Sequence, residues 1–62
     1  MFYSYFYHGN TQINVLRSPH VPRVGERVHM HNKIYKIIDV TYELNGDFTG
    51  PISVLIQVAI DK

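Results

Sequence analysis

The feature that most restricts the fold of this chain is the two-residue alternation in residues 52–60 (ISVLIQVAI). Ile52, Val54, Ile56, Val58 and Ile60 fall on one side of an extended strand, and the residues between them fall on the other. No stretch of the sequence shows a comparable pattern at helical spacing. The sequence therefore predicts an all-β protein with no substantial helix.

The length of the chain predicts one small domain, residues 1–62, near the lower size limit for a core that holds without covalent or metal cross-links. The sequence has no cysteine, which excludes disulfides and thiolate zinc sites. Small β domains without such cross-links often cover their edges by self-association. We expect a homo-oligomer.

The N-terminal residues MFYSYFY are apolar and aromatic, but they lack the basic start and the small-residue cleavage site of a signal peptide. No stretch approaches membrane-spanning length, and the absence of cysteine fits a reducing compartment. We expect a cytoplasmic protein that does not bind membranes.

The first predicted unit is a hairpin over residues 2–16, closed by the two-residue loop Gly9-Asn10, with a positive φ at Gly9. This loop pairs His8 with Thr11, Phe6 with Ile13 and Tyr3 with Leu16. One face of the hairpin then carries Phe2, Ser4, Phe6, Ile13 and Val15. The opposite face carries Tyr3, Tyr5, Tyr7, Gln12 and Asn14.

Residues 17–23 contain Pro19 and Pro22, which predict a loop across one end of the barrel. A short strand at residues 27–30 follows, and His31-Asn32 is predicted as the next tight turn. A wide loop is expected at residues 45–51, before the last strand.

The long strand predicted at residues 34–44 changes phase within its length. Tyr35 and Ile37 share one face, whereas Ile38, Val40, Tyr42 and Leu44 share the other. A β-bulge near Ile37 and Ile38 would return both sets to the core and bend the strand. Five antiparallel strands, mostly in meander order, indicate a small SH3-like barrel. An OB-like barrel is the alternative, although it usually needs a longer chain and a helix.

Residues 22–28 (PRVGERV) and, after a short turn, residues 35–40 (YKIIDV) resemble small, largely uncharacterised SH3-like proteins of phages and mobile elements. The resemblance covers about a third of the chain. It implies the SH3-like fold and, if the protein is phage-encoded, a place in the host cytoplasm, and it says almost nothing about function. It brings no catalytic signature.

Charge is distributed unevenly along the chain. Residues 17–36 have a net charge of +4, from Arg17, Arg23, Arg27, Lys33 and Lys36 against Glu26, whereas residues 37–62 have a net charge of −3. This asymmetry is typical of an anion-binding face. It is equally typical of strands whose opposite charges meet across the sheet.

The candidate partner-binding or anion-binding residues are three tyrosines of one strand face and the cations of the basic segment: Tyr3, Tyr5, Tyr7, Arg17, Arg23, Arg27, Lys33 and Lys36. Tyrosine rings can anchor a protein partner or stack on bases, and nearby cations can bind phosphate. The same rings can also serve only as half-buried sheet surface or oligomer packing.

Metal binding and catalysis have little support in the sequence. His29 and His31 could chelate a metal from one strand face, but a turn at His31 would separate their imidazoles. Ser4, Ser18 and Ser53 lie in no nucleophile motif, and the glycines form no phosphate loop. We expect no catalytic residues, no metal and no cofactor.

These observations leave three functions open. The first is a non-enzymatic interaction module, such as a phage-encoded inhibitor of a host protein, acting through the tyrosines or an added edge strand. The second is a binder of nucleic acid or nucleotide anions, and the third is a structural, oligomer-forming subunit. Because the overall charge is near zero and no nucleic-acid motif is present, the sequence favours the first.

Overall fold

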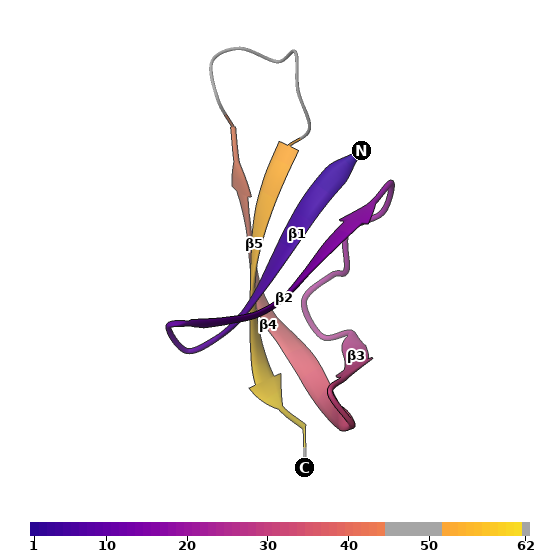
Figure 1. The fold of residues 1–62 in the computed structure, drawn as a ribbon, viewed down its shortest axis with the longest axis vertical. Helices are drawn as coiled ribbons and strands as arrows, with labels where there is room; N and C mark the ends of the chain where they lie inside the picture. Colours follow the sequence, from indigo (N-terminus) through magenta and orange to yellow (C-terminus); the bar gives the residue numbers. More distant parts are fainter. Residues whose placement is uncertain (45–51, 62) are drawn as a thin grey trace.

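The computed structural model describes residues 1–44 and 52–61, and these residues form a single five-stranded sheet (Figure 1). Its strands are β1 (Phe2–His8), β2 (Thr11–Ser18), β3 (Arg27–Met30), β4 (Lys33–Glu43) and β5 (Ile52–Ile60). The described residues contain no helix, which confirms the predicted all-β class. The wide loop predicted at residues 45–51 lies outside the described residues.

The strand order is β2-β1-β5-β4-β3, and β1 pairs with β5 in parallel. The prediction of a purely antiparallel sheet is therefore wrong. The other three pairs (β1–β2, β3–β4 and β4–β5) are antiparallel neighbours in sequence, in agreement with a mostly meander order. Tight turns fix the direction of hairpin partners, but no turn connects β1 to β5. Alternation alone does not distinguish a parallel from an antiparallel neighbour.

The β1–β2 hairpin closes at Gly9-Asn10 as predicted, with φ of 65° at Gly9. His8 pairs with Thr11 and Tyr7 with Gln12, but the register then shifts, so that Phe6 pairs with Asn14 rather than Ile13. Ile13 is the extra residue of this bulge. Beyond the bulge, the predicted register is wrong by one residue. Val15 and Leu16 are adjacent apolar residues, so either register places one of them on the inner side.

The β3–β4 hairpin closes at His31 and Asn32, whose φ values of 52° and 62° fit a turn with two left-handed residues. The predicted bulge in β4 is also confirmed, because the pairing with β5 shifts between Ile37 and Asp39. The bulge buries Ile37 completely and leaves Ile38 52 % exposed. The expected burial of Ile38, Tyr42 and Leu44 is wrong, since all three are at least half exposed.

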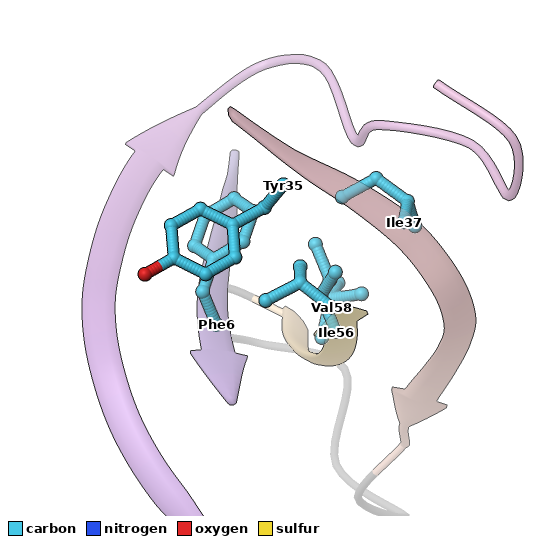
Figure 2. Packing of buried hydrophobic residues seen from close by; sticks show 6 residues of the cluster. Phe6, Tyr35, Ile37, Ile56 and Val58 are labelled. Atoms are coloured by element: carbon cyan, nitrogen blue, oxygen red, sulfur yellow. The ribbon is translucent and has the colours of Figure 1, made fainter. Parts of the chain in front are cut away.

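The core lies inside the curled sheet and is formed by Phe6, Tyr35, Ile37, Val54, Ile56 and Val58 (Figure 2). Three of these residues come from β5, which confirms the buried face predicted from its alternation, whereas Ile60 at its end is exposed. The hydroxyl of Tyr35 points away from the rest of the cluster (Figure 2). Ser4 is also fully buried on this side, and its hydroxyl has no hydrogen-bond partner among the described residues.

The connection between β2 and β3, residues 19–26, closes one side of the core. Val21 packs against the core cluster, and backbone hydrogen bonds from Gly25 N to Ile37 O (2.9 Å) and from Ile37 N to Glu26 O (2.8 Å) hold the loop on β4. This placement agrees with the predicted crossing loop. Arg17, however, belongs to β2 and not to the loop.

The sheet curls into a half-barrel whose two edge strands, β2 and β3, lie on the same side of the molecule (Figure 1). The edge strands do not pair with each other. Residues of both strands line a cleft of about 400 Å³ between them. We call this open line between β2 and β3 the seam.

Candidate functional site

The outer side of the sheet, opposite the core, carries the three tyrosines of β1. Tyr3, Tyr5 and Tyr7 alternate with Phe2, Ser4 and Phe6, and all three are half-buried. Their partners on the same side are Arg17, Val15 and Gln12 of β2 and Ser53, Leu55 and Gln57 of β5. These nine residues are called the tyrosine face below.

Two members of the tyrosine face give it apolar character beside the phenol rings. Val15 is 48 % exposed and pairs with Tyr5, because the bulge at Ile13 turns it to this side. Leu55 of β5 is half-buried and flanks Tyr5 from the other side. The tyrosine face therefore has an apolar centre at Tyr5 and polar groups around it.

The polar margin of the tyrosine face is held by side-chain contacts. The Arg17 guanidinium lies 6.0 Å from the centre of the Tyr3 ring, within the range of a cation–π contact. The Gln57 side chain donates to Gly9 O (2.9 Å) and fixes the β1–β2 turn against β5. The Tyr7 hydroxyl donates to Gln12 Oε1 at 3.5 Å, the outer limit of a hydrogen bond.

Beyond β5, the same side of the sheet is acidic. Asp39, Thr41 and Glu43 of β4 pair with Gln57, Leu55 and Ser53, and all three are exposed. The Thr41 hydroxyl donates to Asp39 Oδ2 (3.3 Å). The tyrosine face thus lies between a cation at the β2 edge and two carboxylates on β4.

The other candidate cations do not join the tyrosines. Arg27 and Lys36 pair with each other across β3 and β4. Three strand spacings separate β3 from β1, about 14 Å across the sheet. Lys33 begins β4 beside the turn at His31 and Asn32. The structure brings only Arg17, of the five predicted cations, to the tyrosines.

Arg23 lies in the β2–β3 connection, at a separate open cavity of about 480 Å³. The aromatic rings of Phe2 and Tyr42 line the same cavity and meet edge to face, with centroids 6.2 Å apart. The Arg23 backbone nitrogen donates to the Glu26 carboxylate, which fixes the loop just before β3. Arg23 is therefore a loop residue at one end of the half-barrel, away from the tyrosine face.

The basic and acidic segments of the sequence form few ion pairs with each other in the fold. Within residues 1–44 and 52–61, the one ion pair is Arg27 to Asp61, with 3.4 Å between Nη1 and Oδ2. Arg27 is directly opposite Lys36, a like charge. The predicted pairing of opposite charges across the sheet is therefore found at one place, between Arg27 of β3 and Asp61 just after β5.

Two of the four histidines make side-chain contacts with residues of other strands. His31 lies in the turn as predicted, and its Nε2 donates to Ile13 O (2.8 Å) of β2. The His8 ring meets Tyr35 edge to face at 6.0 Å. Among the described residues, no three His, Cys, Asp or Glu side chains gather where they could hold a metal ion.

Sequence reasoning missed Val15, Ser53, Leu55 and Gln57 as parts of the tyrosine face. The predicted register places Val15 on the inner side and Asn14 on the outer side, and the bulge at Ile13 reverses both positions. Leu55 and Gln57 join the tyrosines because β5 lies beside β1. The polar alternation of β5 marked its outer side, but its neighbour in the sheet was not readable from the pattern.

Comparisons with known proteins find no matching family model, no similar curated protein and no similar solved structure. In the part of the chain that the structure describes, no helix is long and apolar enough to cross a membrane.

Proposed function

We propose that this protein is a small, non-enzymatic interaction module that binds a partner protein through the tyrosine face. The observation that carries the proposal is the row of three half-buried tyrosines, with Val15 and Leu55 beside Tyr5 and Arg17 at the margin. Tyrosine and arginine are enriched among residues that dominate binding energy at protein interfaces. Half-buried rings on a strand are already ordered, so binding costs them little side-chain entropy.

The resemblance of residues 22–28 and 35–40 to SH3-like phage proteins supports a more specific form of the proposal. In that form the half-barrel is SH3-like, the protein acts in the host cytoplasm, and the partner is a host protein that it inhibits. The acidic strand next to the tyrosine face also favours a protein partner, because Asp39 and Glu43 would repel a nucleic acid placed across β5 and β4.

The experiment is a pull-down from host lysate with the immobilised protein, repeated with Tyr5→Ser. We expect the wild type to retain one protein in stoichiometric amount and Tyr5→Ser to lose it while keeping its circular dichroism spectrum. Tyr42→Ser is the matched control, since Tyr42 is an exposed tyrosine away from the tyrosine face. Equal capture by Tyr5→Ser and the wild type would contradict the proposal.

Anion binding is the second candidate, favoured by the contact between Arg17 and Tyr3. An aromatic ring with a guanidinium beside it can stack a base and bind its phosphate. If this candidate is right, freshly purified protein carries nucleotide or nucleic acid, visible as high absorbance at 260 nm, and binding weakens steeply with salt.

A structural oligomer is the third candidate, in which copies of the chain bury the tyrosine face between them. Light-scattering mass on the same samples distinguishes it from the other two. In that case Tyr5→Ser yields unstable monomer instead of a folded protein that does not bind.

A further inference from the structure

The seam between β2 and β3 is a second surface, which adjoins the tyrosine face at Val15 and Arg17. At one end of it, His31 Nε2 donates to Ile13 O. Beyond this hydrogen bond the two strands separate and leave a cleft of about 400 Å³ between them. Its lining comes from both strands and from the core residue Phe6: Asn14, Val15 and Leu16 of β2, and Val28, His29 and Met30 of β3. Clefts of this size hold small ligands or a few residues of a peptide.

The backbone of β2 faces the seam with hydrogen-bonding groups that the sheet does not use. Ile13 O accepts from His31, and Val15 N donates to the side chain of its neighbour, Asn14 Oδ1 (2.8 Å). Val15 N is therefore not part of the ladder between β1 and β2, and Ile13 is the bulge residue that has no partner in β1. Exposed edge groups of this kind are what an added strand pairs with. Here two side chains occupy them in place of a strand.

The two sides of the seam differ in chemistry. On the inner side, Leu16, Val28 and Met30 are apolar, and Leu16 is 49 % exposed. On the outer side, Arg17 of β2 and Arg27 of β3 are exposed cations. Residues 11–18 and 27–33, which form both edges and the turn after β3, contain no Asp or Glu. The Asp61 carboxylate, beyond the end of β5, forms an ion pair with Arg27 and with no other described residue.

We propose that the β2 edge at this seam binds an extended segment of a partner protein whose side chains alternate between apolar and acidic. Successive side chains of an added strand point to opposite sides. The apolar ones then meet Leu16, Val28 and Met30, and the acidic ones meet Arg17 and Arg27. A second copy of this chain fits less well, because β2 and β3 would bring further arginines and no carboxylate.

The test uses a fluorescein-labelled octapeptide of alternating valine and glutamate, titrated into the protein and followed by fluorescence anisotropy. An octapeptide of alternating valine and lysine is the matched probe. We expect binding of the first and none of the second, with affinity falling as salt rises. Equal binding of both peptides, or of neither, would overturn the proposal.

Val15→Pro removes the N–H group that the added strand needs. It costs the β1–β2 ladder no hydrogen bond, because Val15 N donates to Asn14. We expect it to weaken peptide binding by roughly tenfold or more, whereas Val15→Thr, which keeps the N–H, binds like the wild type. Asn14→Ala frees the same N–H and should tighten binding about fivefold. Equal peptide affinity of Val15→Pro and Val15→Thr would overturn the proposal that the β2 edge binds the peptide.

A double charge reversal, Arg17→Glu with Arg27→Glu, gives a second measurement that does not depend on Val15→Pro folding. It should exchange the preference, so that the valine–lysine peptide binds better than the valine–glutamate peptide. Tyr5→Ser should leave peptide binding unchanged, which separates this proposal from the tyrosine face. A concentration-dependent dimer that Val15→Pro abolishes, with no peptide binding, would assign the edge to a second copy and overturn the partner proposed here.

Discussion

Both sides of β1 carry aromatic residues, but only those on the inner side belong to the core. Phe6 on the inner side is 3 % exposed and belongs to the core, whereas its neighbours Tyr5 and Tyr7 remain half-buried on the outer side. The inner side is enclosed because the sheet curls around it. Among residues 1–44 and 52–61, the outer side is covered only by neighbouring side chains of the same sheet. In a half-barrel built from one sheet, curvature decides which aromatic residues stabilise the fold and which remain available to a partner.

The largest expected effect separates the two sides of β1 directly. Phe6→Ala should lower the free energy of unfolding by about 3–5 kcal/mol, because it leaves a cavity in a small core. That is most of the roughly 3–9 kcal/mol available to a domain of 62 residues. Tyr5→Ala should cost about 1 kcal/mol or less. Urea unfolding followed by circular dichroism measures both. Equal losses would mean that the tyrosine face is a structural layer.

The bulge in β4 offers the same comparison between adjacent residues. Ile37 is fully buried and Ile38 is 52 % exposed. Ile37→Val should therefore lower the free energy of unfolding by about 1 kcal/mol, whereas Ile38→Val should change it by less than about 0.5 kcal/mol. Thermal melting of the two variants against the wild type tests this. The reverse order would place the bulge at a different residue.

Ser4 tests whether every inner position of β1 is optimised for stability. Within the part of the chain that the structure describes, its buried hydroxyl has no hydrogen-bond partner, and such a group costs free energy relative to an apolar one. Ser4→Ala should raise the free energy of unfolding by about 1 kcal/mol, seen as a higher urea midpoint with an unchanged slope. Ser4→Thr, which keeps the hydroxyl and adds a methyl group, is the control. A loss of stability in Ser4→Ala would show that the hydroxyl does have a partner.

The smallest expected effect lies on the outer side of β3. Arg27 forms an exposed ion pair with Asp61 and lies opposite Lys36. Attraction and repulsion offset each other there, so Arg27→Gln should change the free energy of unfolding by less than about 0.5 kcal/mol at low salt and by nothing measurable at high salt. Melting curves at the two salt concentrations check this. A large loss of unfolding free energy that does not depend on salt would indicate that the Arg27 side chain stabilises the fold by packing and not by its ion pair.

Much of the fold follows from local sequence. The alternation of residues 52–60 predicted β5 and its buried side, Gly9-Asn10 and His31-Asn32 predicted two turns, and the phase change at Ile37 predicted the β4 bulge. Each of these features depends on residues close together in the chain. Turn geometry and side-chain alternation encode such features strongly.

The features that could not be predicted depend on residues far apart in sequence. No local pattern sets the direction in which β1 meets β5, and the apolar run of β2 does not mark the bulge at Ile13. The composition of the candidate site was predicted incompletely for the same reason. The three tyrosines were placed correctly on the outer side, but grouping them with the cations required strand order, and only Arg17 lies beside them.

The position of β5 between β1 and β4 has a consequence for how the molecule assembles. The β1–β2 and β3–β4 hairpins can each form from nearby residues, but neither can enclose a core before β5 inserts between them. Pairing β1 with β5 brings together residues from opposite ends of the chain, and closing a loop of that length is slow. Formation of the β1–β5 pair should therefore limit the folding rate. Substitutions at Val54 or Ile56 should then slow refolding, whereas changes in the outer hairpins should mainly speed unfolding.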